Sequence, residues 1–571
     1  MTNAGRCEER LRDHWPRMNS WGQALQRGVE VVFCAWHPVK VAGTALAAAM
    51  ILSASLCDAS ATAGQPAAGP AAPTAVVTVR PIALGRPNPV GFVGLSLEYR
   101  TVLSYSGTDP RAINPVFVRL LQNLVPDQSP VLRIGGDSTD WTWWPVPKML
   151  RPLGVTYDIT PRWLAVARAL AQATRARYIL GINLEANSDP IEAAEARALL
   201  SGIGRRYVAS LELGNEPELY PKLGWYKTAN GVFVPGRPTS YDFHDYSNEF
   251  SSFEKAMSPV PVDGPSSGSY LWLTHLPQFL AAAGSLGDVT VHSYWLNACL
   301  RSPRLLGYPS VPHLLRPDPP SRLARGLKRY AVLAHADHVP IRIDEMNSVT
   351  CRGKHGVSDV FASALWALNA LFQAMSDGVD GVNIHTFPGT ANQLFGFSHV
   401  KGRWVATVRP EYYGLLMFAQ AAPPGTKLMR VIQIATGQTR AWATIGTNGY
   451  VRVVLINDSL TRSSSVLVRT PSPAGRPTLE RLLAPSAEAA EGITIDGQSF
   501  GAQTATGALT GPSSTVTLQS SASAGAITSN VVTLPAASAA MLTIPSRRLP
   551  YTFRGSVSGV LNSAFGDILP G

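Results

Sequence analysis

Two short segments of the sequence carry carboxylates in a setting that could cleave a glycosidic bond. Glu216 follows Asn215 at the end of the apolar run Leu211–Glu216, and Glu345 lies in a second apolar run, Ile341–Asn347. Glycoside cleavage needs one protonated carboxyl group to release the leaving oxygen and one carboxylate to attack the anomeric carbon or activate water. No HExxH, CxxC or Walker motif is present, so this acidic pair is the best prepared chemistry in the chain.

Elements that could bring these acids together occupy residues 92–421, where apolar runs alternate eight times with segments of helical period. The expected strands are Val93–Tyr99, Val131–Ser138, Tyr178–Leu184, Val208–Glu216, Pro261–Gly268, Val289–Trp295, Ile341–Asn347 and Gly381–Phe387. The expected helices are Asn114–Leu124, Pro161–Thr174, Pro190–Leu200, Tyr241–Met257, Trp272–Ala283, Ser321–Ala336, Asp359–Ser376 and Glu411–Ala421. Eight such units predict an α/β fold, a (β/α)₈ TIM barrel with polar strand ends at one face. An open doubly wound sheet is the alternative, and it lacks a Gly-rich phosphate loop after the first strand.

Strand alternation then predicts which acids face the barrel interior. Glu216 falls at the carboxyl end of the fourth strand, and Glu212 lies deeper in the same strand. In the seventh strand, successive side chains point to opposite faces, so Glu345 and Asp344 are expected on different sides. We expect Glu345 to point into the barrel and Asp344 to be structural, paired with Arg342, Arg352 or the outer shell.

After residue 421 the sequence changes to short alternating segments separated by Gly, Pro, Ser and Asn. This texture predicts an accessory antiparallel β-sandwich over residues 422–548, joined by a strand from residues 75–91. Residues 549–571 are expected to form a tail.

The first 63 residues are expected to be a leader. Val41–Leu56 is an uncharged apolar run, too short for a typical spanning helix, and Ala61 and Ala63 fit a signal-peptidase site. Residues 64–74 then form an Ala/Pro linker. The predicted location is secreted, periplasmic or cell-surface, without stable membrane insertion after cleavage; the alternative is a membrane anchor formed by an uncleaved leader.

Three motifs give the chain a family resemblance. Leu132-Arg-Ile-Gly-Gly-Asp-Ser138, Leu211–Glu218 and Glu345–Cys351 resemble glycoside hydrolase family 79, the β-glucuronidase and heparanase family of the clan A retaining glycosidases. The resemblance covers about residues 76–545. It implies an O-glycosyl hydrolase in which Glu216 is the acid/base and Glu345 the nucleophile.

The same resemblance implies the substrate contacts. Asn215 would bind the sugar 2-hydroxyl, Tyr294 would orient the nucleophile, and Asp137 would hold sugar hydroxyls. The loop that contains Thr350 and Gly353 would contact the uronate carboxylate, although it lacks the tyrosine expected there. The strand-end histidines, His292 and His385, are further substrate-contact candidates, or simply hydrogen-bonded strand ends.

Charge and composition are consistent with an anionic substrate. The 571 residues include 49 Lys plus Arg and 38 Asp plus Glu, a net charge of +11. We expect a glucuronide or a uronic-acid-containing oligosaccharide or polysaccharide as substrate, no nucleic-acid partner, no cofactor and no metal. The alternatives are an endo-acting heparanase-like glycosaminoglycan hydrolase and a non-catalytic carbohydrate-binding barrel.

Cysteine positions add one structural expectation. Loss of the leader would remove three of the five cysteines and leave Cys299 and Cys351. An exported protein with two cysteines often joins them. Because Cys299 follows the sixth strand and Cys351 follows the seventh, a disulfide between them would tie together two loops beside Glu345.

Overall fold

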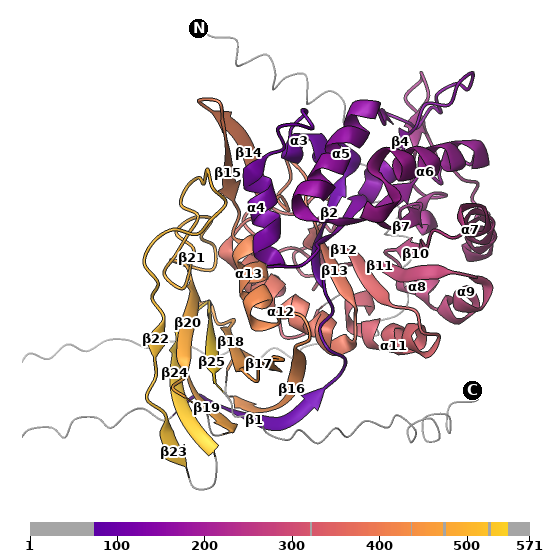
Figure 1. Cartoon of the computed structure of the whole chain (residues 1–571). Helices are drawn as coiled ribbons and strands as arrows, with labels where there is room; N and C mark the ends of the chain where they lie inside the picture. The colour runs from indigo at the N-terminus through magenta and orange to yellow at the C-terminus, as the bar shows by residue number, and fades with distance from the viewer. Residues whose placement is uncertain (1–72, 320–321, 436, 472–474, 524–526, 546–571) are drawn as a thin grey trace, which may run out of the picture. The chain divides into compact units, whose positions relative to one another are not determined.

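The computed structural model describes residues 73–545 except 320–321, 436, 472–474 and 524–526 (Figure 1). The predicted leader, most of the predicted linker and the predicted tail lie outside the described residues. Within them, no helix has the length and apolar character needed to cross a membrane.

Eight parallel strands close into a barrel, which confirms the predicted fold class. Around the barrel they follow the order of the chain: β2 (Val93–Glu98), β3 (Val131–Gly135), β6 (Arg177–Ile182), β7 (Val208–Leu213), β10 (Val262–Ser267), β11 (Leu286–Asn297), β12 (Ile341–Thr350) and β13 (Gly381–His385). Most of their residues are buried because the opposite faces contact the barrel interior and the surrounding helices.

Helices surround the strands on the outside (Figure 1). They are α3 (Tyr99–Ser106), α4 (Pro115–Leu124), α5 (Pro161–Thr174), α6 (Asp189–Ile203), α7 (Phe243–Met257), α8 (Tyr270–Leu273), α9 (Leu276–Ala282), α10 (Val311–Leu314), α11 (Arg322–Ala336), α12 (Phe361–Asp377) and α13 (Glu411–Ala421). Side-chain caps fix several starts: Asn114 accepts from two backbone amides of α4, Thr160 caps α5, and Asp242 forms a capping box with Asp245.

The accessory domain is a single mixed sheet folded around its own core, rather than two purely antiparallel sheets. Its strands are β1 (Ala75–Leu84), β16 (Lys427–Ala435), β17 (Thr439–Ile445), β18 (Val451–Asn457), β19 (Ser464–Pro471), β20 (Thr478–Leu483), β21 (Thr494–Ile495), β22 (Val516–Thr517), β23 (Ser521–Ser523), β24 (Ile527–Leu534) and β25 (Ser538–Ile544). The N-terminal strand β1 joins it as expected, antiparallel to β16 but parallel to β19.

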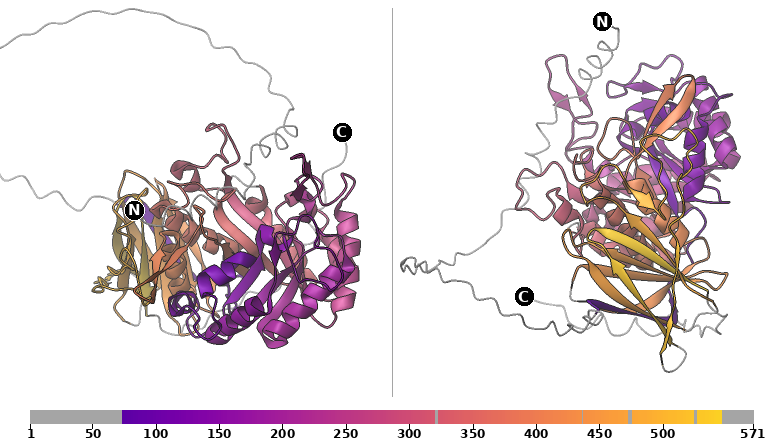
Figure 2. Two further views of the ribbon diagram at one scale, coloured as in Figure 1. Left: turned by 90° about the horizontal axis from the view of Figure 1, so that it is seen from above. Right: turned by 90° about the vertical axis from the view of Figure 1, so that its left-hand side faces the viewer.

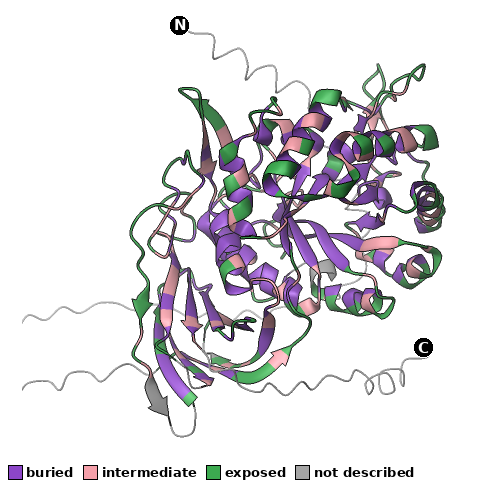
Figure 3. Cartoon of the chain, viewed as in Figure 1, coloured by how far each residue is buried: buried purple, intermediate pink, exposed green. Residues whose placement is uncertain are grey.

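Alternation along β18 shows how the sheet packs on the barrel. Val453 and Leu455 belong to the core of the accessory domain, whereas Val454 and Ile456 belong to the barrel core. At the same boundary Trp442 of β17 stacks on Phe372 of α12. The purple, buried residues in Figure 3 continue accordingly from the barrel into the sheet.

The connections that follow the carboxyl ends of the strands are the longest and carry small strand pairs. These pairs are β4 (Thr142–Trp143) with β5 (Tyr157–Asp158), β8 (Tyr226–Lys227) with β9 (Phe233–Val234), and β14 (Phe395–Val400) with β15 (Arg403–Val408). Figure 2 shows these loops rising beyond the barrel strands. They surround the face where Glu216 and Glu345 lie, as expected for a TIM-barrel active face.

Candidate active site

Arg133 is the centre of the site, a role that was not predicted from the sequence. Its side chain is fully buried inside the barrel. Nη1 donates to Glu345 Oε2 at 2.7 Å, Nη2 donates to Asn215 Oδ1 at 2.8 Å, and Nε donates to Glu212 Oε2 at 2.6 Å. A charged residue in the middle of the apolar strand β3 was the available signal, because arginine is almost never buried without carboxylate partners.

Glu345 is held as a carboxylate. In addition to Arg133, the hydroxyl of Tyr294 donates to Glu345 Oε1 at 2.8 Å, and His385 Nδ1 lies 3.7 Å from Oε2. Burial alone would raise the pKa of Glu345, but His385, His292, Arg133 and the Tyr294 hydrogen bond hold it well below its ordinary value. An ionised carboxylate at this position is suited to nucleophilic attack.

Glu216 lies in the turn after β7 and is linked to this network through His292. The chain turns sharply there: Glu216 has φ = 47°, and its amide donates to the carbonyl oxygen of Ser266 at 2.9 Å. His292 Nδ1 lies 2.9 Å from Glu216 Oε1. Burial would lower the pKa of His292, but the charges of Glu345 and Asp344 raise it well above its ordinary value, so the imidazolium donates to Glu216.

Asp344 corrects the prediction from strand alternation. Pairing between β11 and β12 shifts register at this point, so that Ile343 pairs with Val291 and Glu345 with His292. The extra residue is a β-bulge, which turns Asp344 inward as well. Asp344 Oδ2 lies 3.0 Å from Arg133 Nε. The predicted outer-shell pairing is therefore wrong, and Arg342 pairs with Asp288 instead.

Asp137 and His385 lie at the neighbouring strand ends. Asp137 follows β3 in the short 3-10 helix η2 (Gly136–Thr139) rather than in the strand, and is accessible to solvent. Crowding by protein atoms and the charges of Glu98, Glu216 and Glu345 raise its pKa to about 8. His385 Nε2 lies 3.4 Å from Glu98 Oε1.

Asp140, also missed from the sequence, organises the turn that presents Asn215 and Glu216. Its carboxylate accepts from the backbone amides of Leu184, Glu185 and Asn215 at 3.0–3.2 Å and from the hydroxyl of Tyr220 at 2.9 Å. It thereby joins the connections after β3, β6 and β7. The sequence signal was weak, because Asp140 resembles any acid in a loop.

The expected disulfide forms between Cys299 and Cys351, whose Cα atoms are 6.2 Å apart. Cys351, Arg352 and Gly353 then adopt three consecutive positive φ values, and Gly353 packs against Asn392 so closely that no Cβ would fit. Thr350 and Gly353 make no contact with the Glu216–Glu345 network within the described part of the chain. They form a rim segment beside it.

Gly264–Gly268 has the G-x-S-x-G spacing of many serine hydrolases, and its serine lies close to a histidine and an acid. Ser266 Oγ is 3.1 Å from His292 Nε2, which in turn leads to Glu216. However, Ser266 is fully buried in β10 and also accepts from Arg133 Nη2, and no helix starts directly after it. It therefore holds His292 and is not placed to attack a substrate.

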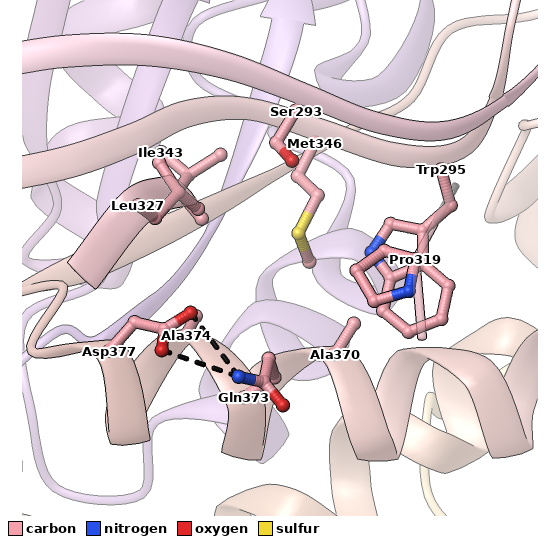
Figure 4. Close-up of a pocket in the computed structure, with 10 residues that line it drawn as sticks. All are labelled: Ser293, Trp295, Pro319, Leu327, Ile343, Met346, Ala370, Gln373, Ala374 and Asp377. Atoms are coloured by element: carbon pink, nitrogen blue, oxygen red, sulfur yellow. Dashed lines mark hydrogen bonds between the residues drawn. The ribbon is translucent and has the colours of Figure 1, made fainter. Parts of the chain in front are cut away.

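A separate crevice lies outside the barrel, between β11 and β12 on one side and α11 and α12 on the other (Figure 4). Trp295 and Met346 line it from the strands, and Gln373 of α12 donates to Asp377 at its edge. Its apolar lining belongs to the layer between strands and helices, and none of the carboxylates of the site reaches it.

Comparisons with known proteins agree with this architecture. Residues 441–541 match the glycosyl hydrolase family 79 C-terminal beta domain. A β-glucuronidase of Aspergillus niger is 24% identical over 73% of this chain and 84% of its own length, and one of Neurospora crassa is 22% identical over 72% and 85%. A 4-O-α-L-rhamnosyl-β-D-glucuronidase of Fusarium oxysporum shares the fold, with a TM-score of 0.58 at 18% identity, over 82% of this chain and 100% of its own.

A family 51 arabinofuranosidase of Xanthomonas axonopodis has the same fold, with a TM-score of 0.55 at 14% identity, over 83% of this chain and 100% of its own. Together the comparisons confirm the predicted resemblance to glycoside hydrolase family 79. The chain is therefore similar to the family 79 β-glucuronidases over most of its length, and its C-terminal region matches the beta domain of that family.

Proposed function

We propose that this chain, a distant relative of the family 79 β-glucuronidases, is a retaining β-glucuronidase that removes terminal glucuronic acid. The observation that carries the proposal is the contrast between the two strand-end acids. Hydrogen bonds from Arg133 and Tyr294 stabilise the ionised form of Glu345, while Glu216, in the turn after β7, is hydrogen-bonded to His292. One carboxylate is thus prepared as nucleophile, and the other is placed to move a proton.

In the proposed reaction, Glu345 attacks the anomeric carbon while Glu216 gives its proton to the glycosidic oxygen, which leaves with the aglycone. The His292 imidazolium then stabilises the Glu216 carboxylate at 2.9 Å. Glu216 next takes a proton from water, whose oxygen attacks the glycosyl ester and frees Glu345. Asn215, fixed by Arg133 through its Oδ1, presents its amide nitrogen for the sugar 2-hydroxyl.

The rim after β12 supports recognition of a uronate. Its left-handed backbone at Cys351, Arg352 and Gly353 is pinned by the disulfide, and Arg352 adds a cation. Backbone amides in such turns can form concave anion sites, but the amide of Gly353 already donates to the carbonyl oxygen of Thr350 at 3.3 Å. We propose that the sugar carboxylate binds there, with Asp137 and His385 on the opposite side of the sugar.

A panel of 4-nitrophenyl glycosides that differ only at carbon five tests the activity. We expect the β-glucuronide to be hydrolysed and the β-glucoside and β-galacturonide to be hydrolysed far more slowly, with retention of configuration by ¹H NMR. Glu345→Gln should lose more than 1,000-fold in kcat, whereas Glu488→Gln, an exposed acid of the accessory domain, should not. Faster chain shortening of heparan sulfate than aryl glucuronide hydrolysis would favour the endo-acting alternative. Binding of glucuronate without turnover would favour the non-catalytic one.

Export is part of the same proposal. The apolar run Val41–Leu56 and the small residues up to Ala63 support a cleaved signal peptide. N-terminal sequencing of the protein from the culture medium should then begin near Gly64. Recovery of the full-length chain in the membrane fraction would instead favour the uncleaved anchor.

A further inference from the structure

A group of exposed apolar side chains borders the catalytic face of the barrel. They lie on the connections that follow the carboxyl ends of β3, β7, β10 and β11. Their exposed fractions range from 39% to 90%: Leu150 (90%), Leu153 (74%), Val232 (60%), Phe233 (39%), Leu271 (57%), Leu305 (47%) and Leu306 (52%). Exposed apolar groups of this kind mark binding surfaces more often than isolated surface residues do.

These connections occupy one side of the barrel mouth. In the closed barrel, β3, β6, β7, β10 and β11 are consecutive neighbours, and Glu216 follows β7 in the middle of this arc. Glu345 lies on β12, just beyond its end. Because the acid must reach the oxygen of the departing group, the arc centred on Glu216 is the side where a leaving group lies.

Leu271 follows a backbone segment that contacts the acid Glu216. A Cβ atom at Gly268 would lie 2.5 Å from Glu216 Oε1, so the backbone before α8 touches this carboxylate. Leu271 follows three residues later, on the first turn of α8. Ser267 Oγ donates to Glu218 at 2.9 Å and fixes the same backbone beside the acid.

The connections after β3 and β7 are packed together. Trp225 donates from Nε1 to the carbonyl oxygen of Asp140 at 2.8 Å, and its ring lies against Gly154, where no Cβ would fit. Trp225 also contacts a small buried cluster that includes Trp143 and Val155. This packing holds Leu153, next to Gly154, in place while leaving it exposed. The surface is therefore pre-formed.

Exposed charge on these two connections is mostly positive. Lys148, Lys222 and Lys227 are exposed, whereas Arg151 pairs with Asp158 at 3.4 Å and Arg237 is buried against Glu249. Lys227 lies over the ring of Phe233, with its Nζ 4.4 Å from the ring centroid. An apolar surface flanked by exposed lysines suits an anionic conjugate whose other end is apolar.

We propose that Leu150, Leu153, Phe233, Leu271 and Leu306 form an aglycone surface that binds the leaving group, and that its preferred leaving groups are apolar aryl or polycyclic ones rather than sugars. This inference rests on the proposed β-glucuronidase activity. The inference extends that proposal by naming the chemical class of the leaving group on the other side of the cleaved bond.

The test compares three substrates that share the same glucuronate: a polycyclic phenol glucuronide, 4-nitrophenyl glucuronide, and a glucuronosyl-galactose disaccharide. The polycyclic phenol is chosen so that its acidity matches that of 4-nitrophenol. We expect kcat/KM to be highest for the polycyclic substrate. Leu153→Ser and Leu271→Ser should each raise its KM about three- to tenfold, with a smaller effect for the other two substrates. Val332→Ser, which changes an exposed residue of α11, is the matched control and should change none of them.

The outcomes separate the inference from the proposed function. If the native chain hydrolyses all three glucuronides but prefers the disaccharide, or if both leucine variants retain the native KM for the polycyclic substrate, the aglycone surface is refuted and the activity stands. If none of the three is hydrolysed and glucuronate does not bind, the proposed function itself fails. Thermal unfolding of each variant confirms that it is folded before its kinetics are compared.

Discussion

The buried acids Glu212 and Asp344 are predicted to carry one negative charge between them, and not two. Both side chains meet at Arg133 Nε, 2.6 Å from Glu212 Oε2 and 3.0 Å from Asp344 Oδ2. Nε carries a single hydrogen, so further carboxylate oxygens are left without a donor unless one acid keeps its proton. Burial and the charge of Asp344 raise the pKa of Glu212 to about 8, against the opposing effect of Arg133. Arg133 and His292 outweigh burial at Asp344 and lower its pKa, so Glu212 holds the proton.

Glu212→Gln imitates this protonated acid, because its amide can donate and accept at the same places. Between about pH 4.5 and 8 the folded protein binds one proton more at Glu212 than the unfolded chain does, so native stability falls as the pH rises through this window. Proton uptake at pH 7 costs about 1.4 kcal/mol per pH unit above 4.5, or about 3 kcal/mol. The variant avoids this cost. We expect it to be more stable than the native protein by up to about 3 kcal/mol at pH 7.

Urea unfolding at pH 5, 6, 7 and 8 measures the effect. The gain in the free energy of unfolding should grow by about 1.4 kcal/mol per pH unit and then level off above pH 8. Glu488→Gln, at an exposed acid, should show no such slope. The double variant Glu212→Gln/Asp344→Asn removes the only charge of the pair and should lose about 3–5 kcal/mol. A Glu212→Gln protein that is less stable at pH 7, with the native pH slope, would refute the shared proton.

Three further predictions concern the mouth of the site. Tyr294→Phe removes the 2.8 Å hydrogen bond to Glu345, and a hydrogen bond to a charged acceptor is worth about 1.5–3 kcal/mol. We therefore expect kcat to fall roughly 10- to 150-fold. The acidic limb of the pH profile should also move to higher pH, because the pKa of Glu345 rises. Asp137 ionises as the pH passes about 8 and then repels an anionic sugar, so KM should rise above pH 8 in the native enzyme but not in Asp137→Asn. Replacing Cys299 and Cys351 together by Ser should raise KM at least threefold; an unchanged KM with a large fall in Tm would show that the disulfide serves the fold and not the rim.

The periodicity of the sequence was sufficient to predict the barrel, because eight apolar runs and their intervening helices are local patterns. Alternation also predicted correctly that Glu345 points inward. It failed at Asp344, since a β-bulge depends on the pairing with β11 and leaves no mark in the β12 sequence. The parallel pairing of β1 with β19 was hidden for the same reason: it joins strands nearly 400 residues apart.

Arg133 was missed because partners from four different strands define it. Ser96, Glu212, Ser266 and Glu345 all lie within 3.3 Å of its guanidinium, and none is near it in sequence. Sequence spacing can place each of them at a strand end or inside the barrel, but it cannot show that they converge. A buried arginine within an apolar strand is nevertheless a visible signal, and it deserves the same weight as a strand-end acid.

The bulge at Asp344 also affects the electrostatics of the proposed reaction. With Glu212 protonated, the Arg133 and His292 cations are balanced by Asp344 and Glu345, and a neutral buried cluster avoids the cost of unpaired charge. When the glycosyl ester forms, Glu345 loses its charge and the cluster becomes positive. At that moment Glu216 has just become a carboxylate, 2.9 Å from His292 Nδ1. Charge lost at the nucleophile, which contacts Arg133, is therefore matched by charge gained at the acid, which contacts His292, and the two cationic side chains lie 3.3 Å apart. Without the second inward acid the free enzyme would start with the excess positive charge, which would favour an ionised Glu216 before the proton is needed.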